Sequence, residues 1–485
     1  MGILSAIVWT PLIGLVVILL LPKDKPAWVR AAALATAAIA LVLSWSLLAS
    51  FDRAAENPQF AESLTWIPEL GMTYTLAVDG LSLPLLLLTT LLVFVALLGS
   101  LHIARSPRSF YAWLLLLESS CLGVFAARDW FLLYVFWEIA LVPMFFLIGL
   151  WGGPQKERAT MTYFLYTLGG SIFMLIGIFA VYLEADPHTF DMDALQAASD
   201  GWTAGFQTWP LLALLAGFAV KIPIFPLHGW LPLAHVQAPA PVSIILSGVM
   251  LKLGGYGLLR STEILPEGIR TLVPLLFVLA LVNILYGAFL AFKQTDVKAI
   301  VAFSSISHMG FVVLGIAALN QSGYSGAVFM MVAHGIVTGA LFLLSGLLYE
   351  RTGTLALDDI AGVGSRTPGF KAMFTLILLA SMGLPGLIQF PGEVQVLLGA
   401  FESFGLPVLL ATFGILITAT FTLRVLGGVL SEKTETRRSG LSDLSRSELV
   451  AVAPLAALTV ILGVVPGVAL SVSNTTIEML IARLG

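Results

Sequence analysis

The chain has 485 residues, of which 58% are apolar and only 11% are charged. Soluble domains carry about 25% charged residues, so soluble enzymes and disordered proteins are excluded. The net charge of −4 and the single cysteine, Cys121, point to no nucleic-acid partner, disulfide framework or metal cluster. The composition therefore predicts an all-α integral membrane protein.

Apolar runs along the chain predict about 14 transmembrane helices, each of about 18 residues or more. They are expected near residues 2–21, 28–50, 80–103, 109–127, 128–151, 159–184, 208–229, 238–260, 269–292, 298–319, 322–350, 370–395, 404–430 and 448–472. The first run is not expected to be a signal peptide, because its basic residues follow the apolar stretch instead of preceding it.

The distribution of Lys and Arg among the links predicts the orientation in the membrane. Links after odd-numbered spans hold sixteen basic residues and links after even-numbered spans hold four. Basic links favour the cytoplasmic side, so both termini are expected on the outer side. The sixteen are Lys23, Lys25, Arg30, Arg105, Arg108, Lys156, Arg158, Lys293, Lys298, Arg351, Arg366, Lys371, Lys433, Arg437, Arg438 and Arg446, and the four are Arg53, Arg128, Arg260 and Arg270.

A short series of ionisable residues remains at bilayer depth once the links are assigned. A charge at the centre of a spanning helix costs about 2.5–3.5 kcal/mol, so such side chains normally face a bundle interior or water. A series spread over several helices is hard to explain as packing alone. Its members are Glu118, Glu138, Lys221, Lys252, His308, His334, Glu393 and Arg424.

Two of the helices that carry these residues are predicted to be broken. Pro223 and Pro226 follow Lys221 in KIPIFPLHGW, and Pro385 and Pro391 precede Glu393 in GLPGLIQFPGE. Irregular backbone at bilayer depth survives only where it is buried in protein or lines a wet cavity. Pro143, one turn after Glu138, is expected to kink a third helix.

The broken helices are five spans apart, which predicts two inverted five-helix repeats, a pattern typical of transporters. The expected domains are residues 1–103 with the first three helices, 104–262 with the first repeat, 263–430 with the second, and 431–485 with the last link and helix. Residue-level similarity between the repeats is not evident, so this division depends on the breaks and charges.

Carboxylates, amines and imidazoles are the side chains that bind and release protons, so the series predicts proton movement. A close Glu138–Lys221 pair would keep both residues ionised, and its separation would release the lysine's proton. Lys252 and His308 would pass the proton along, with Glu393 as the last relay; histidine suits this role because its unperturbed pKa is about 6.5. The chain has no CxxC motif and no dinucleotide fingerprint, so no redox centre is expected in it.

The motifs around these residues resemble a known family. FWEIALVPMFFLIGLWG, KIPIFPLHGWLP, LKLGGYGLLR, QTDVKAIVAFSSISHMGF and HGIVTGALFLLSGLLYER look like the antiporter-like, proton-channel subunits of respiratory complex I, and best like the M (ND4-like) subunits. The resemblance covers residues from about 65 to 430. It implies that Glu138 pairs with Lys221, that Lys252 and His308 form a central axis, that His334 belongs to the same path, and that Glu393 is its acidic end.

The resemblance also implies the surroundings of the chain. Flavin, iron–sulfur clusters and quinone would belong to partner subunits, and no cofactor to this chain. The partners would be other membrane subunits of complex I and the lipid bilayer of a bacterial plasma (inner) membrane, with no nucleic acid. Leu233 and Gln237 depart from the family, whose usual LPDAHVEAP motif has acidic residues there.

Several alternatives stay open at this point. The chain could belong to a cation/proton antiporter complex, to a ferredoxin- or hydrogenase-linked relative, or to a passive membrane scaffold. Glu118 is expected to be buried with a satisfying partner, and Arg424 to neutralise a group within the fold. His228 and His235 are expected to make hydrogen bonds in the link that follows the first broken helix.

Overall fold

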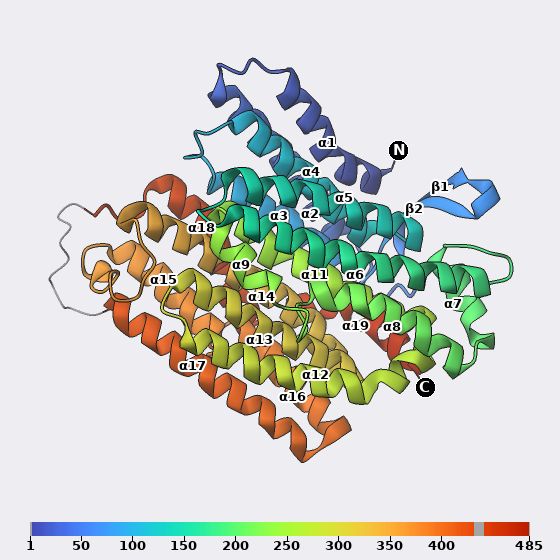
Figure 1. Ribbon diagram of the computed structural model, residues 1–485. Helices are drawn as coiled ribbons and strands as arrows, with labels where there is room; N and C mark the ends of the chain where they lie inside the picture. Colours follow the sequence, from blue (N-terminus) through green and yellow to red (C-terminus); the bar gives the residue numbers. More distant parts are fainter. Residues whose placement is uncertain (1, 431–440, 485) are drawn as a thin grey trace.

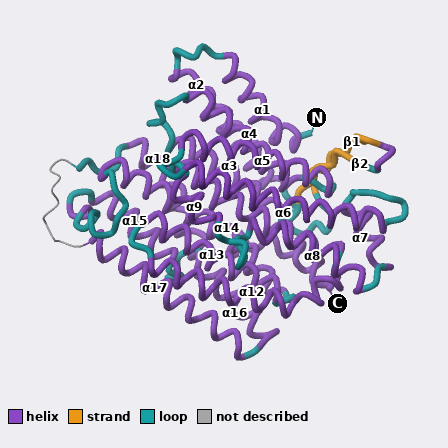
Figure 2. The backbone as a smooth tube through the Cα atoms, viewed as in Figure 1, coloured by secondary structure: helices purple, strands orange, loops and turns teal. Residues whose placement is uncertain are grey.

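The computed structural model describes residues 2–430 and 441–484, which form a bundle of helices with one β-hairpin at its edge (Figures 1 and 2). The helices are α1 (Ile3–Leu20), α2 (Pro26–Ser50), α3 (Ser82–Leu98), α4 (Pro107–Ala126), α5 (Trp130–Trp151), α6 (Lys156–Glu184), α7 (Met192–Ala198), α8 (Ala204–Lys221), α9 (Trp230–Gln237), α10 (Ala240–Ile245), α11 (Leu251–Ile264), α12 (Pro266–Lys293), α13 (Val297–Ala317), α14 (Gln321–Thr352), α15 (Pro368–Ser381), α16 (Gln389–Phe404), α17 (Leu409–Leu430), α18 (Arg446–Val464) and α19 (Gly467–Leu484). The strands are β1 (Gln59–Ile67) and β2 (Met72–Val78).

The predicted helical membrane fold is confirmed, but the predicted number of spans is not. Eleven helical segments of the described residues are long and apolar enough to cross a membrane. The expected span 80–103 contains α3, which has only 17 residues. The spans expected at 208–229 and 370–395 are each divided into two shorter helices by non-helical backbone.

The last expected span, 448–472, is also wrong in its bounds. Helix α18 ends at Val464, and α19 begins at Gly467 after Pro466. Proline has no backbone N–H to continue a helix, which explains the break between two apolar runs that read as one. Lys433, Arg437 and Arg438, three of the sixteen basic residues in the links after odd-numbered spans, lie outside the described residues.

The β-hairpin was not predicted. Apolar runs of about 18 residues indicate membrane helices, and strands as short as these do not contain such runs. Strands β1 and β2 pair antiparallel, with Ser63 opposite Thr75. The hairpin is fixed at two places: Glu62 on β1 accepts hydrogen bonds from the first turn of α1, and Asp129, the N-cap of α5, accepts from Thr73 near the turn.

The innermost helices are those that carry most of the candidate site. In the most apolar stretch of the 240–264 segment and of α14, every residue is buried. In the corresponding stretch of α2, α17 and α18, only a third of the residues are buried. Helices that are apolar on every side either fill a core or face lipid, so the outer helices leave apolar surface for a membrane or neighbouring subunits. The interior therefore belongs to α4, α11, α13 and α14.

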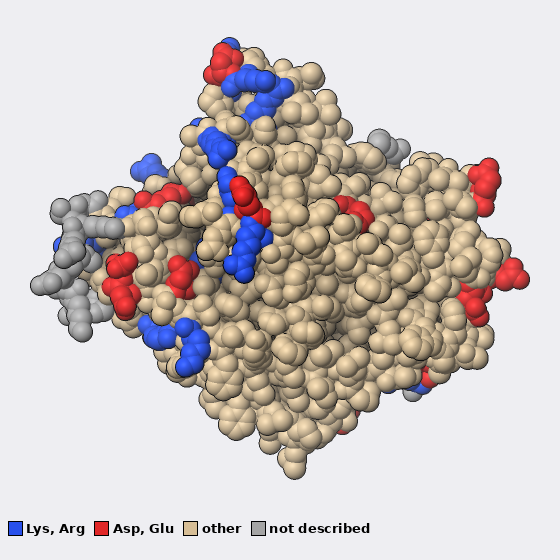
Figure 3. Space-filling view, in the orientation of Figure 1, with Lys and Arg blue, Asp and Glu red and all other residues tan. Residues whose placement is uncertain are grey.

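The surface charges are separated along the bundle. In Figure 3 most visible Lys and Arg side chains lie toward the left and upper left, over the α1–α2 link and the loops near α15, while the right end shows mostly Asp and Glu. This separation agrees with the loop charges in the sequence, and it leaves a broad uncharged band between the two ends, as a bilayer requires.

Replacing Glu62 by Gln is expected to loosen the first turn of α1. The Glu62 carboxylate accepts bonds from the backbone of Gly2, Leu4 and Ser5 and from the Ser5 hydroxyl. Partial burial acts to raise the pKa of Glu62, but these bonds outweigh it and lower the pKa overall. A lowered folded-state pKa means that the contact stabilises above the ordinary carboxyl pKa and is lost as pH falls through the folded value.

Hydrogen exchange measured by mass spectrometry tests this prediction. Residues 2–10 should take up deuterium faster in Glu62→Gln than in the parent, with α4 unchanged. Ser63→Ala is the matched control, because its hydroxyl bonds to Thr75 within the hairpin and not to α1. Equal exchange in the two variants would contradict the prediction.

Candidate functional site

The first broken helix places Lys221 at the end of α8, where the chain leaves helical geometry for residues 222–229. The amide of Ile224 donates to the carbonyl of Ala219, which has no helical donor because Pro223 stands four residues later. Asn283 of α12 accepts from the amide of Phe225 (2.7 Å) and donates to the carbonyl of Pro223 (3.1 Å). The break is therefore held by a side chain from a neighbouring helix, as buried irregular backbone requires.

Lys221 and Glu138 face the same region without forming an ion pair. Lys221 is 2% exposed, its Nζ has no hydrogen-bond partner, and it lies 5.6 Å from the ring centres of both Trp137 and Tyr163. Glu138 is half-buried beside Ser171, near enough for its charge to act on Lys221. Among the described residues no contact within 4.0 Å joins the two, so the structure shows the separated arrangement of the predicted switch.

Lys252 lies at the centre of the bundle, directly after a turn of π-helix at Leu246–Met250. Its Nζ lies 2.6 Å from the carbonyl oxygen of Ser247 and 2.6 Å from Nδ1 of His334 on α14. Lys252 and His334 are both 0% exposed. Turns of π-helix occur often at functional sites because they redirect backbone groups, and here one directs a carbonyl at an amine.

A row of contacts continues from His334 through His308 to Glu393. The rings of His334 and His308 are 5.7 Å apart between centres. The amide nitrogen of Gln389 lies 2.7 Å from Nδ1 of His308 and donates to Oε1 of Glu393 at 3.1 Å. His308 and Glu393 themselves are 3.9 Å apart, so Gln389 bridges them.

The second broken helix shapes the Glu393 end of this row. Helix α15 ends at Ser381 and α16 begins at Gln389, so Glu393 lies in the first turns of the second half. Gly383, in the break, has a φ of +75°, and a Cβ there would come within 2.2 Å of Oε2 of Glu393. Glycine is therefore needed both for the turn and for the approach of the carboxylate.

The predicted site residues thus form two groups. Lys252, His334, His308 and Glu393 lie in one connected row, while Glu138 and Lys221 stand apart from it. In the part of the chain that the structure describes, no hydrogen bond or ion pair joins Lys221 to Lys252.

Three other residues differ from expectation. Glu118 on α4 is 0% exposed and neither carboxyl oxygen has a partner, so its expected partner is missing. Arg424 is exposed and donates to the carbonyl of Gln294 at 2.5 Å, which places it at the periphery and not in the path. His228 stacks on Phe225 and its Nδ1 has no partner.

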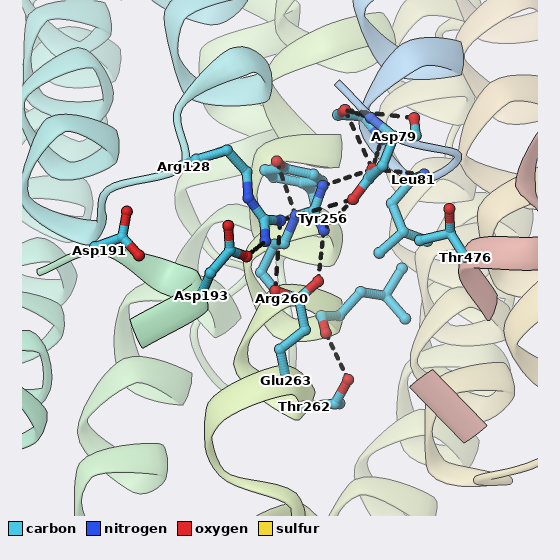
Figure 4. A network of polar contacts seen from close by, with 12 residues as sticks. Asp79, Leu81, Arg128, Asp191, Asp193, Tyr256, Arg260, Thr262, Glu263 and Thr476 are labelled. Carbon is cyan, nitrogen blue, oxygen red and sulfur yellow. Dashed lines mark hydrogen bonds and ion pairs between the residues drawn. The ribbon is translucent and has the colours of Figure 1, made fainter. Parts of the chain in front are cut away.

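A buried cluster of ion pairs lies at the C-terminal end of α11, where Arg260 and Glu263 are located (Figure 4). Arg260 makes two bonds with Asp79, at 2.6 and 2.7 Å, and a third with Glu263 at 2.5 Å. Arg128 lies 3.5 Å from Glu263 and 3.7 Å from Asp79, and it also pairs with Asp193. We define the ion cluster as these five residues.

Arg128 and Arg260 were counted among the basic residues of links, but neither faces solvent. Arg128 is nearly buried and Arg260 is fully buried. Both residues lie near the ends of predicted spans, which is why they were assigned to solvent-exposed links. The sequence does not show that Asp79 and Glu263 face them in the folded chain. Burial would raise the pKa of Asp79, but Arg260 and Arg128 hold it well below its usual range. The cluster joins α7, α11, the β2–α3 link and the α4–α5 link at one end of the bundle.

Comparison with known proteins agrees with this geometry. Residues 127–418 match the profile of the family described as NADH:quinone oxidoreductase/Mrp antiporter, TM. The chain belongs to this family. It is 38% identical to NADH-quinone oxidoreductase subunit M of Rhodobacter capsulatus, over 99% of this chain and 96% of the relative. It is 41% identical to an NAD(P)H-quinone oxidoreductase chain 4 of a Picosynechococcus strain, over 93% and 83% of the two chains.

Solved structures show the same fold. A chain of respiratory complex I from Thermus thermophilus superposes with a TM-score of 0.91 at 32% identity, covering 99% of this chain and 100% of the other. A chain of the Mrp complex from Dietzia superposes with a TM-score of 0.86 at 19% identity, covering both chains completely. The second likeness shows a shared fold alone.

Gln389, Asn283 and the ion cluster are site residues that the sequence did not reveal. Gln389 lies in the GLPGLIQFPGE segment of the second break, and it links His308 to Glu393. A signal was available for Gln389, because a polar side chain four residues before Glu393 lies on the same helical face. Asn283 lies in an apolar run with no titratable neighbour in sequence, so nothing marked it.

Replacing Arg260 by Met is expected to destabilise the chain strongly. Removing one partner of a buried ion pair leaves an uncompensated charge and costs about 3–5 kcal/mol. Here Asp79 and Glu263 would both lose their closest cation. The amount of the chain in membranes and its melting temperature in detergent should fall together.

Arg270→Met is the matched control. Arg270 pairs with Glu267 at 2.9 Å, but both side chains are more than a third exposed. Exposed pairs contribute about 0–1 kcal/mol, so this variant should accumulate and melt like the parent. A stable Arg260→Met chain would show that the cluster does not hold this end of the bundle.

Proposed function

We propose that this chain is a proton-pumping membrane subunit of a complex that oxidises NADH, NADPH or a related donor and reduces quinone. The observation that carries the proposal is the buried row of Lys252, His334, His308, Gln389 and Glu393, which links proton-binding groups at contacts of 2.6–3.1 Å with one ring-to-ring step. The relatives that are 38–41% identical are named for NAD(P)H- or NADH-quinone oxidoreductases.

The row suits proton transfer because each member can accept and donate a proton or reorient a hydrogen bond. Lys252 can hand a proton to Nδ1 of His334, and His308 can receive it and pass it across the 3.9 Å gap to Glu393, while the Gln389 amide holds the two side chains together. Glu138 and Lys221 form a second group that can close into an ion pair. Closing that pair would change the charge felt along the row, which couples the two groups electrostatically.

The two broken helices support the inverted five-helix repeats over residues 104–262 and 263–430. In each repeat a titratable residue lies beside non-helical backbone: Lys221 at the end of the first half-helix and Glu393 at the start of the second. Repeats with discontinuous helices hold their ion path at the midplane of the membrane.

The proposal extends to the surroundings of the chain. Flavin, iron–sulfur clusters and quinone would lie in partner subunits, and sister antiporter-like subunits would cover exposed apolar helices such as α6 and α12. The location would be a bacterial plasma membrane with both termini on the outer side, which the basic α1–α2, α5–α6 and α12–α13 links support.

A cation/proton antiporter complex is the second candidate, favoured by the shared fold with the Mrp chain at 19% identity. The oxidoreductase is preferred because the quinone-oxidoreductase relatives are about twice as similar in sequence. Proton pumping that responds to an added electron donor, and not to a Na⁺ or K⁺ gradient, separates the two.

Replacing Glu138 by Gln or Lys221 by Met is expected to stop donor-driven proton pumping while the complex still assembles. Both changes remove a charge without removing bulk, and Lys221 has no hydrogen bond to lose. Pumping by inverted membrane vesicles should fall at least tenfold, in line with the 10²–10⁴-fold effect of a positioned proton-transfer group.

Glu267→Gln is the control for surface carboxylates, since Glu267 is exposed beside Arg270. It should pump like the parent. Assembled complexes that carry Glu138→Gln and Lys221→Met and still pump at the parental rate would support a scaffold role and refute the proposal.

A further inference from the structure

Helix α18 contacts the second broken helix at its non-helical turn. The backbone amide of Ile388, in the break, donates a hydrogen bond of 3.0 Å to the backbone carbonyl of Thr459 on α18. Ile388 and Thr459 are both 0% exposed. The first amides of a helix have no acceptor within that helix, so a buried amide just before α16 needs an acceptor from elsewhere. Helix α18 supplies it.

Gly463 allows α18 to come this close. It lies one turn after Thr459, against the carbonyl oxygen of Gly386 and the Cα of Leu387. A Cβ at position 463 would lie 2.4 Å from these backbone atoms, whereas ordinary contacts begin at 3.4 Å. Backbone atoms cannot rotate away as a side chain can, so a larger residue would force α18 and the break apart by about 1 Å.

This contact lies directly beside the Glu393 end of the row. Gln389, the residue after Ile388, bridges His308 and Glu393 with contacts of 2.7 and 3.1 Å. The Ile388 amide therefore fixes the chain one residue before the bridging side chain. Hydrogen bonds of this kind are normally no longer than about 3.2 Å, so a shift of the break by about 1 Å would open the bridge.

The first broken helix is held in a corresponding way. There Asn283 of α12 accepts from the amide of Phe225 and donates to the carbonyl of Pro223. The breaks lie in predicted spans 7 and 12, and the helices that hold them are spans 9 and 14, so each break is held by the span two places later. An arrangement that recurs with the repeat favours a role in the row over simple packing.

We propose that Thr459 and Gly463 are positioning residues of the row. Through the backbone of the second break, they hold Gln389 at the distance that joins His308 to Glu393. Neither residue carries a proton itself: the Thr459 carbonyl fixes the break, and the absence of a side chain at Gly463 sets how closely α18 approaches it. This inference rests on the proposed function, because it concerns the end of the same row.

The test uses the full complex in inverted membrane vesicles with Gly463→Ala. The complex should assemble, and donor-driven proton pumping should fall at least tenfold, because a misplacement of about 1 Å can cost about 10²-fold in rate. Gly467→Ala is the matched control. It makes the same change four residues later, where a Cβ would meet no atom of the described residues within 4 Å, so it should pump like the parent.

A double variant separates positioning from a merely structural role. Gln389→Leu removes the bridge directly, so adding Gly463→Ala to it should lower pumping by less than about twofold further, since both changes act on the same contact. If Gly463→Ala only weakened the fold, its loss would instead multiply with that of Gln389→Leu.

Ile388→Pro decides the matter if the Gly463→Ala complex does not assemble. Proline removes the amide that donates to Thr459, and the φ of −55° at Ile388 suits a proline ring. Ile388→Ala is the comparison, because it shortens the side chain and keeps the amide. The complex with proline should pump at least about tenfold more slowly than the complex with alanine.

Parental pumping by the assembled Gly463→Ala complex, a multiplied loss in the double variant, or equal pumping by the Ile388→Pro and Ile388→Ala complexes would overturn the inference. Its failure is distinguishable from failure of the proposed function. If Glu138→Gln abolishes pumping while Gly463→Ala pumps normally, the proposed function stands and only the positioning role of α18 is wrong. If Glu138→Gln also pumps normally, the proposed function fails first.

Discussion

The organisation of this protein depends on the cost of placing charge away from water. A bilayer offers no hydrogen bonds, so every ionisable group at its depth must be satisfied by the protein or by water that the protein encloses. The chain meets this constraint in two ways. Its ion cluster pairs Arg260 and Arg128 with Asp79, Glu263 and Asp193, whereas its row of proton-binding groups shares contacts without full compensation. The first arrangement fixes charge, and the second leaves it free to move.

The ion cluster and the row share helix α11, which carries Lys252 of the row and Arg260 and Glu263 of the cluster. In the cluster two guanidinium groups face three carboxylates, so its charge is held in fixed pairs. The π-turn before Lys252 and the two broken helices supply the irregular backbone around which the row is built.

Much of this could be predicted from the sequence, because the bilayer makes the signals strong. The apolar runs located most helices, the prolines located both breaks, and the scarcity of charge located Lys252, His308, His334 and Glu393. The sequence could not show which of these meet, since Lys252 and His334 are 82 positions apart. The resemblance implied that Glu138 pairs with Lys221, and the structure shows the two residues separated, which is one of the two states of the predicted switch.

The failures have physical causes as well. Arg260 and Arg128 read as link residues because their compensating carboxylates are distant in sequence, with Asp79 separated from Arg260 by 181 positions. His235 was expected to make hydrogen bonds in the link after the first broken helix, whereas its side chain is fully buried and neither ring nitrogen has a hydrogen-bond partner. The hairpin and the α18–α19 break each involve only a few residues, so long apolar runs do not indicate them.

The central claim is that protons cross this chain through its buried row, and Lys252 is the residue on which that claim depends most. The direct measurement is the rate of coupled quinone reduction, and the protons moved per two electrons, by the complex with Lys252→Met in sealed vesicles. Lys293→Met, which removes an exposed lysine at the end of α12, is the control. We predict that the Lys252→Met complex assembles but reduces quinone at less than about a tenth of the control rate. An assembled Lys252→Met complex with the control's rate and proton ratio would contradict it.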